Sequence, residues 1–358
     1  MRRYLFFVNQ PYAYSILRPL QAAIRKRGDE VAWFVAGCTA APLREDELQL
    51  RTLDEAQRYP ALATFVPGDW VPPSLPGIKV EVFHGLARNK RGHSSEDASD
   101  HYQIRGWFDL YCTHADTDTA KFSQLAQQHK YFAVAKTGWP KLDPLFSAGQ
   151  PQGPRPRAAG EPPVVFYAST FSRSITSAPA LADKIEALAA GGGWRFIVTL
   201  HPKMDPAITQ RYRQMAGPNL RFVESDTDLL PLLQEADLML CDTSSIMFEF
   251  MFLDRPVVTY RTRMPGPWLL DVQDIGDLEA NLQRATERPP ALLQAEAALC
   301  RELHSFSDGR SSARVLQAVD EFLASPTKLR RKPLNLLRRL RVRRRLRKAL
   351  AENTHSAP

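Results

Sequence analysis

Short apolar runs alternate along the first 150 residues with stretches in which apolar positions recur every three or four residues. Residues 4–8 are apolar throughout, which is typical of a strand buried on both faces of a parallel sheet. Residues 15–26 have helical spacing, Gly28 closes that helix, and a second apolar run occupies residues 31–35. This order of strand, helix and strand predicts a parallel sheet covered by helices.

A second alternation of the same kind begins at residue 164. It follows residues 147–163, which are rich in Pro, Gly, Ala and Arg and are typical of a linker. We therefore predict an α/β protein with two doubly wound, Rossmann-like domains, residues 1–150 and 160–325, and a separate basic segment at 326–358. Ligands of such sheets bind beyond the carboxyl ends of the strands, so we expect the site in a cleft between the domains.

The composition is that of a globular protein, with 44% apolar and 24% charged residues. The four cysteines lie far apart without a Cys-x-x-Cys pair, which argues against a disulfide scaffold and a zinc site. No apolar run approaches the roughly 18 residues of a membrane-spanning helix, and the apolar run after Met1 is too short for a signal peptide. We expect a protein of the cytoplasmic compartment with neither a metal nor a cofactor.

The net charge of +8 is concentrated at the C-terminus, because residues 327–358 hold twelve Lys or Arg and one acidic residue. The rest of the chain is therefore mildly acidic, at −3, and nucleic acid is not an expected partner.

Apolar residues recur among the arginines of this tail at steps of one to four positions between residues 336 and 350. An Arg-rich helix with a leucine face is typical of an interfacial membrane anchor, and each basic residue near an anionic leaflet contributes about 1 kcal/mol. A solvated tail and an RNA-binding tail are the alternatives. We expect peripheral attachment to an anionic membrane, on the cytoplasmic face of the inner or plasma membrane. The residues expected there are Leu336, Leu340, Arg338, Arg339, Arg343 and Arg344.

Four small polar residues, Asp242, Thr243, Ser244 and Ser245, stand between an apolar strand and a short predicted helix. Hydroxyl groups beside the free N–H groups of a helix start favour a phosphate, although plain N-capping explains the same residues. Glu249, one turn further on, is a candidate ligand for a ribose hydroxyl or a solvated side chain.

Histidines directly follow two of the predicted strands. His201 and Lys203 come after the strand at 194–199 and are suited to phosphate oxygens. His84 comes after the strand at 79–83, where a neutral imidazole can accept a proton from a hydroxyl. A structural hydrogen bond is the alternative for each histidine. The basic residues Arg88, Lys90 and Arg91 suit either a loop that meets an anionic acceptor or a solvated loop.

Taken in order, several segments resemble the CDP-glycerol glycerophosphotransferase family of teichoic-acid and related surface-polymer synthesis. The likeness covers about residues 80–265, and His-Gly alone would mean little. The matching segments are His84-Gly85, Gly138-Trp-Pro-Lys-Leu-Asp143, Tyr167-Ala-Ser-Thr170, Leu200-His-Pro202, Asp242-Thr-Ser-Ser-Ile-Met-Phe-Glu249 and Leu253-Asp-Arg-Pro-Val-Val-Thr-Tyr260.

The resemblance implies a GT-B fold whose C-terminal domain holds most of the donor nucleotide. It implies that His84 is the catalytic base and that His201 contacts the donor diphosphate. The chain departs from the family pattern at Leu86, where Thr is usual, at Lys141 and Lys203, where Arg is common, and at Thr243, where Tyr is common. The donor-binding residues implied are Lys203, Asp242, Thr243, Ser244, Ser245, Glu249, Thr170 and Lys141.

The function that we predict is therefore transfer of a polyol phosphate, glycerol phosphate in the first place. The donor is CDP-linked, the acceptor is a hydroxyl of a lipid-linked molecule or surface glycan, and CMP is released. A GT-B glycosyltransferase that uses a nucleotide sugar is one alternative. A non-catalytic membrane or RNA adaptor is the other.

Overall fold

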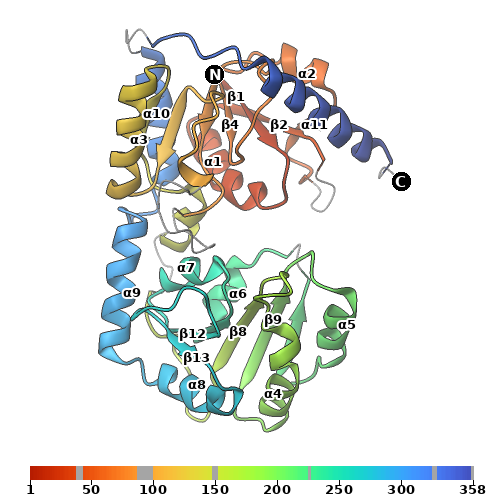
Figure 1. Cartoon of the computed structure of the whole chain (residues 1–358), viewed down its shortest axis with the longest axis vertical. Helices are drawn as coiled ribbons and strands as arrows, with labels where there is room; N and C mark the ends of the chain where they lie inside the picture. The colour runs from red at the N-terminus through yellow and green to blue at the C-terminus, as the bar shows by residue number, and fades with distance from the viewer. Residues whose placement is uncertain (38–42, 87–99, 147–151, 225–226, 325–328, 356–358) are drawn as a thin grey trace. The chain divides into compact units, whose positions relative to one another are not determined.

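The chain forms two α/β units, each built on a parallel sheet (Figure 1). The computed structural model describes residues 1–37, 43–86, 100–146, 152–224, 227–324 and 329–355. The first unit contains the N-terminal described residues up to 146 and also the described residues from 302 onward. The second unit contains residues 152–301.

The first unit has a seven-stranded sheet in the order β3-β2-β1-β4-β5-β6-β7, with every neighbouring pair parallel. The apolar run at residues 4–8 forms the buried central strand β1, as predicted. The strands are β1 (Arg3–Val8), β2 (Glu30–Val35), β3 (Leu48–Leu50), β4 (Ala63–Val66), β5 (Ile78–Glu81), β6 (Leu110–Thr113) and β7 (Ala133–Lys136).

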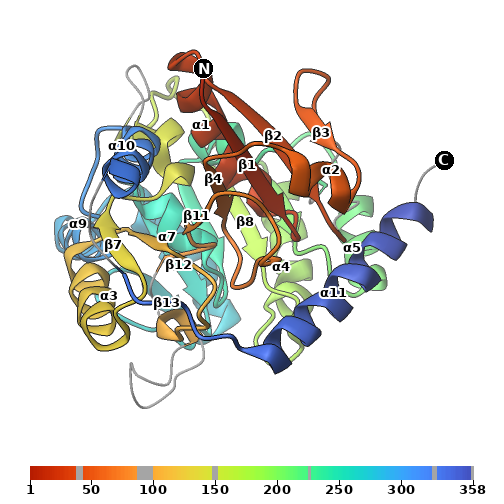
Figure 2. The same cartoon turned by 90° about the horizontal axis from the view of Figure 1, so that it is seen from above.

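Helices cover both faces of this sheet, as its two-sided burial requires (Figure 2). Helices α1 (Ala13–Lys26) and α10 (Ser311–Ala324) pack against each other on one face. The opposite face, which presents Leu5 and Phe7, is covered by α2 (Leu53–Arg58), α3 (Asp116–His129) and α11 (Leu336–His355). Two 3-10 helices, η2 (Asp100–Tyr102) and η3 (Pro140–Phe146), complete the unit.

The second unit has a six-stranded sheet in the order β10-β9-β8-β11-β12-β13, again with every neighbouring pair parallel. In both units the chain first adds two strands on one side of the first strand and then crosses over to add the remaining strands on its other side. This is the doubly wound arrangement. The elements are β8 (Val164–Ser169), α4 (Ala178–Ala190), β9 (Arg195–Leu200), α5 (Pro206–Gln214), β10 (Leu220–Val223), α6 (Leu230–Glu235), β11 (Leu238–Cys241), α7 (Ile246–Met251), β12 (Val257–Tyr260), β13 (Leu270–Val272), η4 (Ile275–Asp277), α8 (Leu278–Thr286) and α9 (Pro290–Leu303). The predicted pair of Rossmann-like units is confirmed.

The division of the chain differs from the predicted domains, which placed 160–325 in the second domain and 326–358 in a separate tail. Helix α10 packs on α1 and buries Val315, Leu316 and Val319. Helix α11 buries Val342 and Leu346 in the same core cluster as Leu5. The chain therefore returns to the first unit because its sheet needs both helices as cover.

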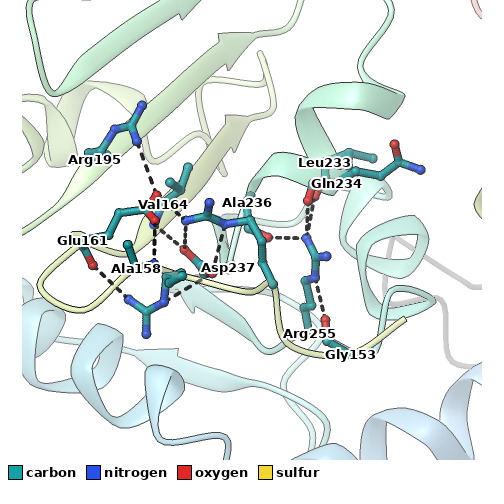
Figure 3. Close-up of polar contacts among 12 residues, drawn as sticks. Gly153, Ala158, Glu161, Val164, Arg195, Leu233, Gln234, Ala236, Asp237 and Arg255 are labelled. Atoms are coloured by element: carbon teal, nitrogen blue, oxygen red, sulfur yellow. Dashed lines mark hydrogen bonds and ion pairs between the residues drawn. The ribbon is translucent and has the colours of Figure 1, made fainter. Parts of the chain in front are cut away.

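A fully buried arginine holds together three segments of the second unit (Figure 3). Arg255, just before β12, donates to the carbonyls of Gln234 at 2.6 Å and Ala236 at 2.5 Å, at the end of α6. It also donates to the carbonyl of Gly153 at 2.9 Å in the connecting segment. The last carbonyls of a helix have no partner within the helix, so a guanidinium there meets both their hydrogen-bonding need and their negative dipole end.

A carboxylate beside this arginine holds the start of β8 (Figure 3). Asp237 accepts from the backbone N–H of Val164 at 2.7 Å and from the guanidinium of Arg155 at 3.2 Å. The same guanidinium also donates to Glu161 at 2.9 Å. These contacts lie at the amino ends of the strands and leave the carboxyl ends to the loops that carry the predicted site.

Glu296 on α9 should make the stability of the protein fall as pH rises. Its side chain is 2% exposed, Oε1 accepts from the N–H of Val257 at 3.1 Å, and burial raises its pKa to about 9. The folded state therefore keeps a proton that the unfolded chain releases near its ordinary pKa of 4.5, so folding loses free energy between these two values.

Glu296→Gln mimics the protonated form and removes this dependence. We expect the variant to exceed the parent in free energy of unfolding by on the order of 2 kcal/mol near pH 8, and to match it near pH 4. Denaturant unfolding at the two pH values measures the difference. An equal gain at both pH values would assign the effect to packing and not to ionisation.

Candidate active site

His84 lies at the carboxyl edge of the first sheet, three residues after β5. Its exposed imidazole is tilted against the ring of Tyr12, with centroids 5.5 Å apart. Tyr12 belongs to the turn between β1 and α1, so two strand-end loops meet at this histidine. Carboxyl ends of parallel strands are where such sheets bind ligands.

The backbone immediately before His84 is held in an unusual conformation. Phe83 has a φ of +56°, in the left-handed region that a bulky residue rarely adopts. Its carbonyl accepts from Trp139 Nε1 at 3.2 Å, its ring stacks on His101 at 4.8 Å, and the ring of His114 stands edge-on at 5.4 Å. These contacts fix the direction in which the chain presents His84.

The two histidines behind Phe83 stay neutral. Burial lowers the pKa of His101 and of His114 to about 3 each. At neutral pH they therefore place no positive charge beside His84. Their contribution to the candidate site is therefore shape and not charge.

The Gly138–Asp143 segment attaches the returning C-terminal chain to the first unit. The backbone N–H of Trp139 donates to His304 Nε2 at 2.8 Å, and the Asp143 carboxylate accepts from the N–H groups of Ser311 and Ser312, each at 2.7 Å. Asp143 thus caps the first turn of α10. Lys141, which was predicted to bind the donor, lies in this segment with its ammonium 5.4 Å from the Trp139 ring centre.

The buried carboxylate of Asp242 organises the loop after β8 in the second unit. It accepts from the N–H of Thr170 at 3.0 Å, from Ser169 Oγ at 2.6 Å and from both the N–H and Oγ of Ser177, at 3.0 and 3.1 Å. Burial raises the pKa of Asp242, and the hydrogen bonds oppose that rise. The structure therefore brings Asp242 and Thr170 together, with the carboxylate engaged by the protein itself.

Thr243 has a similar role toward the loop after β12. Its buried Oγ1 accepts from the N–H of Arg263 at 3.0 Å and lies 3.4 Å from Thr262 Oγ1. Ser244 and Ser245 follow half-buried at the start of α7. Within the described part of the chain, the Ser245 side chain makes no capping hydrogen bond to α7. Half-buried Glu249 lies in the first turn of α7.

His201 is exposed directly after β9, and its ring orientation is set by its own turn. The N–H of Lys203 donates to His201 Nδ1 at 3.1 Å, so the neutral imidazole carries its proton on Nε2 and presents a donor there. The His201 ring lies 4.4 Å from that of Phe171, and the Lys203 ammonium lies 5.8 Å from the same ring. A ring donor and an ammonium together suit an anionic group.

Phe171 is a site residue that sequence reasoning missed. It is 39% exposed, an unusual place for a phenylalanine, and it joins the loop after β8 to the loop after β9. The available signal was its position, directly after Tyr167-Ala-Ser-Thr170.

The predicted acceptor-binding residues Arg88, Lys90 and Arg91 lie outside the described residues. Among the residues that the structure does describe, no group of three or more His, Cys, Asp or Glu side chains could hold a metal ion. The polar groups that the described loops of the candidate site present are imidazole, hydroxyl and ammonium groups.

The family model for CDP-glycerol:poly(glycerophosphate) glycerophosphotransferases matches residues 77–321. The chain belongs to this family. The matched region begins one residue before β5 and includes His84, His201 and the segment from Asp242 to Glu249. The chain is accordingly a transferase of the CDP-glycerol glycerophosphotransferase type, as the sequence predicted. No curated protein sequence matches it.

Solved structures that resemble this family member include a variant of the wall teichoic acid polymerase TagF. That likeness has 12% sequence identity, covers 90% of each chain and has a TM-score of 0.62. The UDP-GlcNAc 2-epimerase of Neisseria meningitidis bound to UDP-GlcNAc also matches, at 12% identity over 90% of this chain and 100% of that chain, with a TM-score of 0.56. At such identities the likeness shows the fold, and the GT-B-like prediction is confirmed.

Substitutions in the Asp242–Ser245 segment of this glycerophosphotransferase-family chain should distinguish a residue that fixes a loop from one that does not. Asp242→Asn places donors opposite donors, so we expect the free energy of unfolding without nucleotide to fall by on the order of 2 kcal/mol. Ser244→Ala should change it by less than about 1 kcal/mol. Asp183→Asn is the matched control, because that carboxylate is 84% exposed in a surface ion pair.

Denaturant unfolding measures all three variants. An Asp242→Asn protein as stable as the parent would contradict the loop-fixing role.

Proposed function

We propose that the chain transfers glycerol phosphate from CDP-glycerol to a hydroxyl of a lipid-linked or surface-glycan acceptor and releases CMP. The observation that carries the proposal is the family match, which spans the strand-end loops of both units. The exposed imidazoles of His84 and His201 lie on these loops. A TagF variant soaked with CDPG, 12% identical with a TM-score of 0.62, supports the same donor class on the same fold.

In the proposed reaction, the acceptor hydroxyl gives its proton to the neutral imidazole of His84. The acceptor oxygen then forms a bond to the β-phosphorus of the donor. The bond from that phosphorus to the bridging oxygen breaks, and CMP leaves with the bridging oxygen and its electron pair. The product is a phosphodiester, and no oxidant or further reactant is needed.

The charge that develops on the diphosphate is the main electrostatic demand of this step. We assign the stabilisation of this charge to the Nε2–H of His201, the ammonium of Lys203 and the hydroxyls of Ser244 and Ser245. Glu249 remains the candidate for the ribose, and Thr170, Asp242 and Thr243 shape the loops. Lys141 is assigned to the donor, and Arg88, Lys90 and Arg91 to the acceptor.

We also propose that the protein attaches peripherally to the cytoplasmic face of the membrane through its basic C-terminal helix. Among the described helices, none is long and apolar enough to cross a membrane. An amphipathic, Arg-rich helix is suited to the interface instead. Such attachment would bring the enzyme to a lipid-linked acceptor.

A thermal-shift assay with cytidine and uridine nucleotides tests the identity of the donor nucleotide. We expect CMP, CDP and CDP-glycerol to raise the thermal midpoint, since a ligand at 100 times its Kd adds about 2.7 kcal/mol to the folded state. UDP and UDP-sugars serve as the comparison in a thermal-shift assay. Selective stabilisation by uridine nucleotides would favour a nucleotide-sugar transferase, and no shift with any nucleotide would favour the adaptor.

Replacing His84 and His201 should separate catalysis from donor binding. We expect His84→Ala to lower kcat by about 100-fold or more while the thermal shift with CDP persists. His201→Ala should weaken that shift and also lower kcat by about 100-fold. His129→Ala, at an exposed position at the end of α3, is the matched control. CMP release from CDP-glycerol is the readout, and normal turnover of His84→Ala would rule out the base.

A further inference from the structure

The apolar residues of helix α11 fall into two sets with different surroundings. Val342 and Leu346 are 5% and 4% exposed, and Ala349 and Leu350 pack beside them on the core of the first unit. Leu334, Leu336, Leu337 and Leu340 are 66%, 65%, 73% and 53% exposed. We call these four residues, at and just before the start of the helix, the leucine patch.

The buried set makes α11 an integral part of the first unit. Val342 and Leu346 belong to the core cluster that contains Leu5 and Phe7 of the central strand. Gly37 shows how closely the helix lies, because a Cβ at that position would stand 2.8 Å from Ala349 Cβ. The helix therefore covers the sheet and is not a free tether.

The segment that leads into α11 is also held by the first unit. The Lys332 ammonium binds the Asp109 carboxylate and the carbonyl of Trp107, each at 2.7 Å. The carbonyl of Arg105 accepts from Asn335 Nδ2 at 3.3 Å and from Arg338 Nη1 at 2.8 Å. Leu334, Leu336 and Leu337 are thus displayed from a fixed backbone.

The charged residues of the segment that carries the leucine patch have one sign. Residues 329–351 contain no Asp or Glu, and the exposed cations on α11 include Arg341, Arg343 and Arg344. The nearby carboxylate of Asp109 is already paired with Lys332. The patch is therefore apolar at its centre and cationic at its border.

We propose that the leucine patch inserts into the interface of an anionic phospholipid surface while the arginines of α11 contact the headgroups. Leucines beside arginines fit the boundary between acyl chains and headgroups, where long cationic side chains reach outward. A second copy would bring two acid-free helices together against their mutual repulsion, and an RNA would leave the leucines in water.

This inference rests on the proposed membrane attachment and narrows it. Leu336 and Leu340 remain at the lipid, whereas Val342, Leu346, Ala349 and Leu350 belong to the protein core. Because the patch is fixed on the first unit, binding at the patch orients the unit that carries His84 relative to the lipid surface.

Vesicle cosedimentation of the full chain tests the assignment. The probes are vesicles of phosphatidylcholine alone and vesicles that also contain phosphatidylglycerol. The patch variant is Leu336→Gln with Leu337→Gln, the core variant is Val342→Ala with Leu346→Ala, and the headgroup variant is Arg343→Gln with Arg344→Gln. Leu323→Gln is the matched control, because Leu323 is also an exposed leucine, at 43%, but lies on α10.

We expect the parent to bind the phosphatidylglycerol vesicles preferentially. The patch variant should bind them at least about tenfold more weakly, with an unchanged thermal midpoint. Leu323→Gln should bind like the parent. The headgroup variant should bind the phosphatidylglycerol vesicles more weakly, and its binding should depend less on salt than that of the parent. The core variant should have a lowered thermal midpoint.

Parental binding by the patch variant would overturn the proposal, as would equal binding of the parent to both vesicles. A parent that does not bind vesicles, whether or not it binds RNA, would also overturn it. So would a parent that forms a dimer which the patch variant does not form. CMP release with a water-soluble acceptor is measured separately. Its absence in a parent that still binds vesicles would count against the transfer reaction and not against the patch.

Discussion

Both faces of a parallel sheet must be covered by apolar side chains, and the rest of this structure depends on that constraint. In the described part of the connection between β2 and β4 of the first unit, one short helix, α2, contributes to one face of the sheet. Helix α11 supplies Val342 and Leu346 to the same face, from the far end of the chain. The arginine-rich helix therefore has a structural role in the core of the first unit, independent of any further function.

The same constraint sends the polar groups to the ends of the strands, where most of them hold loops together. Asp143 caps α10, Asp242 gathers the loop after β8, and Arg255 joins β12 to the end of α6. Much of the family pattern is thus the means by which the loops keep their shape. The exposed imidazoles of His84 and His201 stand out because they are held by their surroundings yet open to solvent.

The sequence was sufficient to predict what depends on neighbours along the chain. Continuous apolar runs gave the central strands, and histidines after two of them marked both strand-end loops. The three-residue edge strands β3 and β13 carry too short a pattern to be read. The partners of Asp242 lie 65 to 73 positions away, and the place of α10 and α11 depends on a core assembled from the other end of the chain, so no local pattern contains them.

On the proposed function, the assigned groups are distributed over both units. The groups assigned to the diphosphate, His201, Lys203 and the two serines, belong to the second unit. The proposed base His84 and the proposed lipid-binding patch both belong to the first, joined through one hydrophobic core. A lipid-linked acceptor and the base that activates it would then be brought together by the same rigid body. That arrangement would give the proposed lipid-binding helix a reason to be packed into the core of the first unit.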